Sequence, residues 1–200
     1  FYDRIADVHN LAMKVNGYRS SVSRYLKSLD LEIGPESLVL DAGSGTGVVT
    51  LGFHDAGYTP RNIIALDLSY KSLRISRDQF AKRSNPTNST LAVQGDILDM
   101  PFEDESFDLI LMCGVLEYLP VDEGLRESAR VLKKGSPLIL LPVRQSVVGS
   151  VLELIYKFRI RPLEHFREAA APYFDVVDNH NFPITEPIGW SKTSMVLKKK

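Results

Sequence analysis

Val39-Leu40-Asp41-Ala42-Gly43-Ser44-Gly45-Thr46-Gly47 is the stretch that decides the fold of this chain. An apolar run that ends in an acid leads into a loop with three glycines, and residues 48–56 then favour a helix. Glycines permit a tight turn and let a ligand lie against bare backbone. A helix N-terminus also offers unpaired N–H groups to an anion. The stretch therefore predicts a strand–loop–helix unit with a ligand site at the carboxyl end of the strand.

Two common phosphate-binding fingerprints do not fit this loop. The dinucleotide fingerprint needs a glycine or alanine at the position of Val48, whereas the third glycine here is Gly47. The P-loop needs a Gly-Lys-Ser/Thr run, and none follows. Taken alone, the loop also fits a glycine turn that serves only the packing of the strand against the helix.

The alternation of strand and helix continues along the chain. Strands are predicted over residues 37–41, 62–67, 90–94, 107–113 and 137–143, and helices over 1–30, 48–56, 69–82 and 122–132. Such alternation predicts a mostly parallel sheet with helices on both faces. Residues 174–181 and 191–198 look like two strands joined by a loop without a helix, which indicates an antiparallel pair.

Two further acidic residues end strands beside the glycine loop. Asp67 ends the second strand, where a carboxylate can accept hydrogen bonds from both hydroxyls of a ribose. Asp96 follows the third strand, where it could accept from an adenine amino group while Ile97 packs on the ring. Each acid alone is more simply a capping or loop carboxylate. Acids at the ends of three neighbouring strands, with Asp41 as the third, favour a nucleoside site.

The composition excludes several other classes of protein. A chain of 200 residues suits one domain with a real core. With 24 basic and 25 acidic side chains it lacks the positive field of a nucleic-acid binder, so no nucleic-acid partner is expected. The single cysteine and scattered histidines predict no disulfide and no metal site. No run of residues is apolar enough for a transmembrane segment and no signal pattern opens the chain, so we expect a cytoplasmic protein.

On these motifs the chain resembles the class I S-adenosylmethionine-dependent methyltransferases of the small-molecule, type 11-like kind, from about residue 36 onward. Residues 39–47 look like their first motif, and Leu66-Asp67 looks like their ribose acid. Residues 95–102 look like the adenine motif, and residues 107–110 with 114–119 look like the fourth-strand motif. Residues 130–136 resemble the run that leads into the fifth strand.

The resemblance implies an α/β fold with a Rossmann-like, seven-stranded, mostly parallel sheet in the order 3-2-1-4-5-7-6, strand 7 being antiparallel. It implies S-adenosyl-L-methionine as cofactor and S-adenosyl-L-homocysteine as product. The residues expected to bind this cofactor are Asp41, Gly43, Ser44, Gly45, Gly47, Asp67, Leu68, Asp96, Ile97 and Cys113. We expect one methyltransferase domain over residues 1–200, with an N-terminal helical lid (1–34), a cofactor-binding core (36–143), an acceptor-side helical insert (144–172) and terminal antiparallel strands (173–200).

The resemblance implies methyl transfer to a small-molecule acceptor with an oxygen, nitrogen or carbon nucleophile, of an aromatic or lipid-like kind. Because the sulfonium is already activated, alignment of the reactants is the main task of the protein. No catalytic residue is assigned; an optional base could come from His9, Tyr18, Glu117, Tyr118 or His165. The alternatives are a non-catalytic S-adenosylmethionine-binding regulatory subunit and a protein or RNA methyltransferase.

Two segments are expected to set acceptor specificity. The first is residues 1–29, whose opening Tyr2-Asp3-Arg4-Ile5-Ala6 is similar to that of quinone-biosynthesis C-methyltransferases. The second is the apolar segment 145–161, for which ordinary packing on the sheet is the simpler interpretation. The sharper hypothesis is a hydrophobic roof over an aromatic or lipid-like acceptor, with Arg159 and Arg161 in peripheral contact with a membrane surface.

Overall fold

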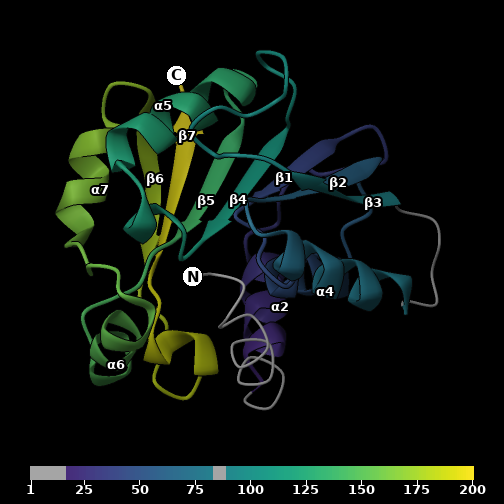
Figure 1. The fold of residues 1–200 in the computed structure, drawn as a ribbon. Coiled ribbons are helices and arrows are strands. Elements are labelled where there is room, and N and C mark those ends of the chain that lie inside the picture. Colours follow the sequence, from purple (N-terminus) through teal and green to yellow (C-terminus); the bar gives the residue numbers. More distant parts are fainter. Residues whose placement is uncertain (1–16, 83–88) are drawn as a thin grey trace.

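A twisted sheet with helices on both faces organises the chain (Figure 1). The structure is a computed structural model that describes residues 17–82 and 89–200. The strand order is β3-β2-β1-β4-β5-β7-β6; β1 to β5 pair in parallel, and β7 is antiparallel to both β5 and β6. The strands are β1 (Leu38–Ala42), β2 (Asn62–Asp67), β3 (Ser89–Gln94), β4 (Leu109–Cys113), β5 (Pro137–Leu141), β6 (Phe174–His180) and β7 (Ser194–Lys199).

Helices connect and cover these strands. They are α2 (Tyr18–Ser28), α3 (Val48–Asp55), α4 (Tyr70–Ala81), α5 (Val121–Val131), α6 (Val147–Tyr156) and α7 (Leu163–Ala170), with short 3-10 helices η1 (Leu116–Tyr118) and η2 (Pro187–Trp190). The α4 helix begins after Ser69, whose hydroxyl accepts from the Ser72 N–H at 3.1 Å, as an N-cap residue does.

Successive residues of the central strands face two separate cores. Leu40 of β1 packs in a core that contains residues of α5 and α7, whereas Val39 packs in a core that contains residues of α2 and α3. In β4, Ile110 and Leu109 divide between the two cores in the same way. Because side chains alternate across a strand, the near-continuous apolar runs supply both faces at once. This explains why the central strands read as unbroken hydrophobic segments.

The expected fold class, strand order and antiparallel last strand are confirmed. The connection between β6 and β7 differs, since it contains the 3-10 helix η2 instead of plain loop. Of the helix expected over residues 1–30, the structure describes α2, and residues 1–16 lie outside the described part. The insert 144–172 contains α6 and α7.

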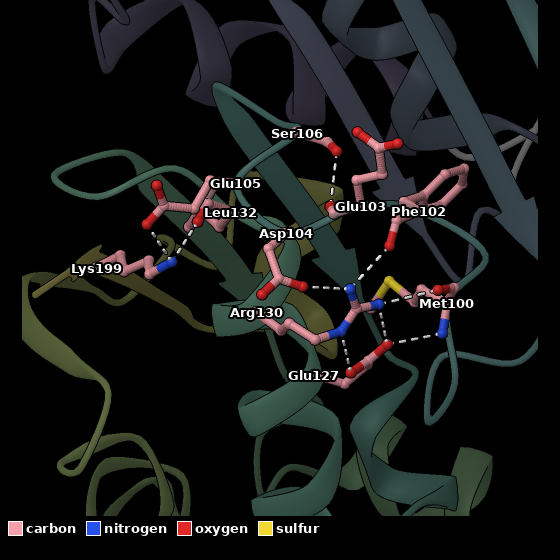
Figure 2. Close-up of polar contacts among 10 residues, drawn as sticks. All are labelled: Met100, Phe102, Glu103, Asp104, Glu105, Ser106, Glu127, Arg130, Leu132 and Lys199. Carbon is pink, nitrogen blue, oxygen red and sulfur yellow. Dashed lines mark hydrogen bonds and ion pairs between the residues drawn. The ribbon is translucent and has the colours of Figure 1, made fainter.

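Arg130 of α5 fixes the turn that follows β3. Figure 2 shows its guanidinium pointing into this turn, where it donates to the carbonyls of Met100 (3.0 Å) and Phe102 (2.8 Å) and to Asp104 Oδ1 (2.8 Å). Two further N–H groups donate to the carboxylate of Glu127, which also accepts from the Met100 N–H at 2.8 Å. The turn that carries the adenine motif is therefore anchored to α5 at several points.

Candidate functional site

A cavity of about 230 Å³ lies where the parallel strands end, at the edge at which open α/β sheets bind ligands. Its polar part is lined by the glycine loop after β1 and by the turns after β2 and β3. Its apolar part is lined by residues from η1, from the end of β5 and from α6: Val115, Tyr118, Leu119, Val143, Leu152, Tyr156 and Phe158. The two parts are continuous, so one cavity combines two kinds of surface.

The glycine loop is held open by its backbone conformation. Gly43 and Gly45 have φ of 75° and 53°, in the left-handed region that favours glycine. A Cβ on Gly43 would lie 2.5 Å from Val115 Cγ2, so the loop can approach the chain after β4 only without a side chain. The N–H groups of Gly43 and Ser44 donate to the Leu66 carbonyl at 2.8 and 2.9 Å, which ties the loop to β2.

Two hydroxyl groups of this loop are buried at the wall of the cavity. Ser44 and Thr46 line the cavity and are 7% and 3% exposed. Their side-chain oxygens have no hydrogen-bond partner among the residues that the structure describes. A buried hydroxyl without a partner costs about 1 to 3 kcal/mol, which a polar ligand would recover. The donor set therefore fits the polar parts of an adenosyl amino acid.

Asp67 and Asp96 line the polar part of the cavity, as expected from the sequence. The Asp67 carboxylate accepts from the Gly45 N–H at 2.7 Å and from the Ser69 N–H at 2.8 Å, so it orients the glycine loop as well. Asp96 accepts from the Leu98 N–H at 2.9 Å. A carboxylate oxygen can accept more than one hydrogen bond, so these contacts leave capacity for ligand hydroxyl and amino groups.

Most of the expected cofactor residues are brought together, and two are not. Gly43, Ser44, Gly45, Asp67, Leu68, Asp96, Ile97 and Cys113 line the cavity. Asp41 and Gly47 lie outside this lining. A Cβ on Gly47 would lie 2.7 Å from the Phe80 ring, so this glycine serves the packing of α3 against α4.

Asp41 is a buried carboxylate inside the scaffold. Its Oδ2 accepts from the Thr50 N–H at 3.0 Å and from the Thr50 hydroxyl at 2.5 Å. Burial raises the pKa of Asp41 to about 7, the hydrogen bonds from Thr50 oppose this rise, and the nearby charge of Asp67 adds to it. Asp41 therefore links β1 to α3, and it is not among the residues that line the cavity.

The expected base candidates fall in different places. Tyr18 and Tyr118 line the cavity, and the Tyr18 hydroxyl lies 3.4 Å from Cys113 Sγ in a hydrogen bond. Burial, and then the proximity of Cys113 and Glu117, raise the pKa of Tyr18 well above its usual value, so it stays a neutral hydroxyl. Glu117 is buried outside the cavity lining, where it accepts from the Val143 N–H. His165 is on α7 away from the lining, and His9 lies outside the described residues.

Sequence reasoning missed Lys192, a cavity-lining residue that precedes β7. Lys192 is brought to the site because it pairs with Val143 after β5. This contact joins residues far apart in the sequence, so no local motif could predict it. Among the described residues no cluster of metal-ligating side chains was found, and no helix has the length and apolarity to cross a membrane.

Comparison with known proteins shows that this chain is similar to methyltransferases. The model of a family described as "Methyltransferase domain" matches residues 40–140. The chain is 33% identical over 110 residues to a demethylmenaquinone methyltransferase of Porphyromonas gingivalis, covering 54% of this chain and 44% of that protein. A demethylmenaquinone methyltransferase of Shouchella clausii is 29% identical over 160 residues, covering 78% and 66%. The chain thus spans less than two thirds of the length of these two relatives.

A solved structure shares the fold. Geranyl diphosphate C-methyltransferase from Streptomyces coelicolor A3(2), in complex with Mg²⁺, geranyl diphosphate and S-adenosyl-L-homocysteine, superimposes with a TM-score of 0.73. The match covers 90% of this chain and 80% of that chain at 15% sequence identity. At this identity the likeness speaks for the architecture of the sheet and its helices.

Proposed function

We infer the activity from one premise: this chain belongs to the methyltransferase-domain family whose model matches residues 40–140. We propose that it transfers the methyl group of S-adenosylmethionine to a small-molecule acceptor. The observation that carries the proposal is the continuous cavity, in which strand-end carboxylates, and hydroxyls without a partner in the described part of the chain, adjoin an apolar chamber.

The polar part of the cavity suits the cofactor. Asp67 would accept from the ribose hydroxyls and Asp96 from the adenine amino group, while Ile97 packs on the ring. The hydroxyls of Ser44 and Thr46 and the bare backbone of the glycine loop would hold the methionyl end. When bound, the cofactor supplies a methyl group on a sulfonium that is already activated. Residues 36–143 act in this proposal as the cofactor-binding core.

The apolar part of the cavity suits the acceptor and excludes water. Leu152 and Tyr156 reach into it from α6, so the insert 144–172 acts as the roof. The rings of Tyr118 and Phe158 meet edge to face, with centroids 5.2 Å apart, and both line the chamber. Holding two reactants in line can supply about 7 to 11 kcal/mol of barrier reduction, so the residues need to align more than to react.

We propose a flat aromatic acceptor of the hydroquinone class. Two observations support this choice: the aromatic lining of the chamber, and the names of the relatives, which are demethylmenaquinone methyltransferases. A cytoplasmic location is part of the proposal, in keeping with the free thiol of Cys113.

We further propose that the outer face of α6 rests on an anionic lipid surface. Val147 and Leu154 are 84% and 82% exposed there, and the exposed cations Lys157 and Arg159 follow the helix directly. Apolar side chains flanked by lysine and arginine favour the interface of an anionic bilayer. A roof that is apolar on both sides would let a lipid-like acceptor pass from the bilayer into the chamber.

Calorimetry with S-adenosylhomocysteine tests the cofactor assignment. The chain is expected to bind it, and Asp67→Ala is expected to weaken binding by about 1 to 3 kcal/mol through lost charged hydrogen bonds. Asp78→Ala removes the same charge from an exposed position of α4 and should leave the affinity unchanged. Equal affinities of Asp67→Ala and the unaltered chain would contradict the assignment of the ribose acid.

Turnover tests the activity itself. The chain is incubated with S-adenosylmethionine and a panel of hydroquinones and naphthohydroquinones, and mass spectrometry follows the gain of one methyl group. A methylated hydroquinone is the expected product. Cofactor binding with no methylated product from any acceptor, in a panel extended to cell-extract metabolites, would favour the regulatory subunit instead.

A further inference from the structure

Lys192 spans the strand ends of the acceptor side. It pairs with Val143 just before β7, and the sheet order places β5 between this residue and the end of β4. Its Nζ nevertheless lies so close to Gly114, which follows β4, that a Cβ on that glycine would overlap it. The side chain therefore crosses the end of β5 and brings its ammonium group to the cavity, whose lining includes both residues.

The Lys192 side chain is largely buried, and its ammonium group has no partner among the described residues. The residue is only 6% exposed, its Nζ is not among the fully buried polar atoms, and no hydrogen bond or ion pair joins Nζ to a described residue. Glu117 accepts from the Val143 N–H through Oε1, its buried Oε2 has no hydrogen-bond partner among the described residues, and no ion pair joins it to Lys192. A cation at the wall of a largely apolar chamber favours an anionic partner, which a ligand in the cavity can supply.

The surroundings of Lys192 show which partner fits. Burial raises the pKa of the Cys113 thiol, and the nearby Lys192 opposes that rise, so the lysine lies close to Cys113 at the cavity wall. The neighbouring Tyr18 hydroxyl is neutral and hydrogen-bonded to Cys113. Beyond them the chamber is apolar and aromatic. This arrangement suits a flat apolar molecule with one anionic oxygen.

We propose that Lys192 recognises the acceptor by pairing its ammonium group with an oxyanion formed from an aromatic hydroxyl. The inference rests on the proposed function and names the group that selects the acceptor. In a chamber with few other polar groups, the ion pair would orient the ring and favour the ionised hydroxyl over the neutral one. The methionyl carboxylate of the cofactor presents the same chemistry, so the experiment has to separate the two sources of the oxyanion.

The probe is 4-nitrophenol, whose anion absorbs visible light, added to the chain loaded with S-adenosylhomocysteine. The unaltered protein is expected to bind the anion and to lower the apparent pKa of the bound probe by about one unit or more. Lys192→Met should abolish this shift and weaken binding at least about tenfold. Lys192→Arg keeps the charge and should retain part of the shift. Lys198→Met removes an exposed charge from β7, the strand that follows Lys192, and is expected to change nothing.

Several results would overturn the proposal. They are an unshifted probe in the unaltered protein, an equal shift in Lys192→Met, or an equal loss in Lys198→Met. A tenfold loss of S-adenosylhomocysteine affinity in Lys192→Met would assign the ammonium group to the methionyl carboxylate. A large drop in the melting temperature of Lys192→Met would reveal a partner inside the chain, because removal of a charge without a partner in the chain should not destabilise. Failure of the unaltered chain to bind S-adenosylhomocysteine would instead refute the proposed function.

Discussion

Asp41 ends the apolar part of the glycine stretch, yet its carboxylate accepts hydrogen bonds from Thr50 inside the scaffold. Its position in the sequence is that of a ligand-binding acid, and its neighbours in space are those of a structural one. The distinction has a measurable consequence, because burial raises the pKa of Asp41 to about 7. Asp67, by contrast, both lines the cavity and orients the glycine loop.

The pKa of Asp41 predicts a loss of stability with rising pH. The folded chain holds this proton more tightly than the unfolded chain, whose aspartate pKa is about 3.9, so the free energy of unfolding should fall between about pH 4 and pH 7. The resulting loss in the free energy of unfolding is on the order of 4 kcal/mol once Asp41 is ionised in the folded chain as well. Asp41→Asn keeps an oxygen acceptor for Thr50 but cannot titrate, and should flatten this part of the profile. Urea denaturation at a series of pH values measures it.

A matched variant isolates the effect of Asp41. Asp175→Asn changes an exposed aspartate of β6 and should leave the pH profile as it is in the unaltered chain. The same slope in Asp41→Asn and the unaltered chain would show that Asp41 is ionised throughout and stabilised by Thr50 alone.

At the scale of elements, the turn after β3 depends on α5. The hydrogen bonds with Glu127 and Asp104 raise the pKa of Arg130, and those with Arg130 lower the pKa of Glu127, so the group keeps its charges over the physiological range. The guanidinium binds several groups of the turn and Glu127 of α5 at once because it carries five N–H donors in a planar fork. A lysine at this position has one ammonium and cannot reach them together.

Arg130→Lys is therefore expected to lower the free energy of unfolding by about 1 to 3 kcal/mol, a range kept modest because the side chain is 33% exposed. It should also weaken S-adenosylhomocysteine binding a few-fold, since the anchored turn follows Asp96 and Ile97. Urea denaturation and calorimetry measure the two effects. Arg126→Lys, on an exposed position of the same helix, serves as the control. Unchanged stability and affinity in Arg130→Lys would show that the turn after β3 keeps its structure without the contacts of Arg130.

Sequence patterns predicted the elements well where local chemistry dominates. The strand Asn62–Asp67 has the bounds that were predicted, and the helix predicted over residues 69–82 is α4 (Tyr70–Ala81). Pairing between distant segments could not be read in the same way. Lys192 reaches the cavity only because its neighbour in space is Val143, and η2 interrupts a connection that reads as plain loop. The cofactor side of the site lies within sequential motifs, whereas the acceptor side is assembled by tertiary packing.

At the scale of the whole molecule, α6 has two apolar faces, one at the cavity and one exposed on the outside. Leu152 and Tyr156 line the cavity, whereas Val147, Val151 and Leu154 are exposed on the outside. Figure 1 shows α6 set apart from the sheet beside the turn that carries η2, where the Ser146 hydroxyl donates to the Trp190 carbonyl at 2.7 Å. Trp190 of η2 and the preceding Ile184 are also exposed.

The outer face of α6 predicts lipid binding. The chain should co-sediment with vesicles of phosphatidylcholine and phosphatidylglycerol, and less with phosphatidylcholine alone, because cations flank the apolar patch. The double variant Val147→Glu, Leu154→Glu should lose most of this binding at unchanged S-adenosylhomocysteine affinity. Val177→Glu alters an exposed valine of β6 and is the control. Absence of sedimentation with either lipid would remove the membrane contact from the proposal.

The place of β7 in the sheet has a consequence for how the molecule is made. Residues 194–199 come late in the sequence but lie between β5 and β6, and Met195 and Leu197 are fully buried. The ribosome has already synthesised β1 to β6 before this strand appears, so β5 and β6 lack their shared pairing partner until then. Translation that pauses or stops ahead of residue 194 would leave the edges of these two strands open to self-association, and chaperone demand should be greatest at that moment.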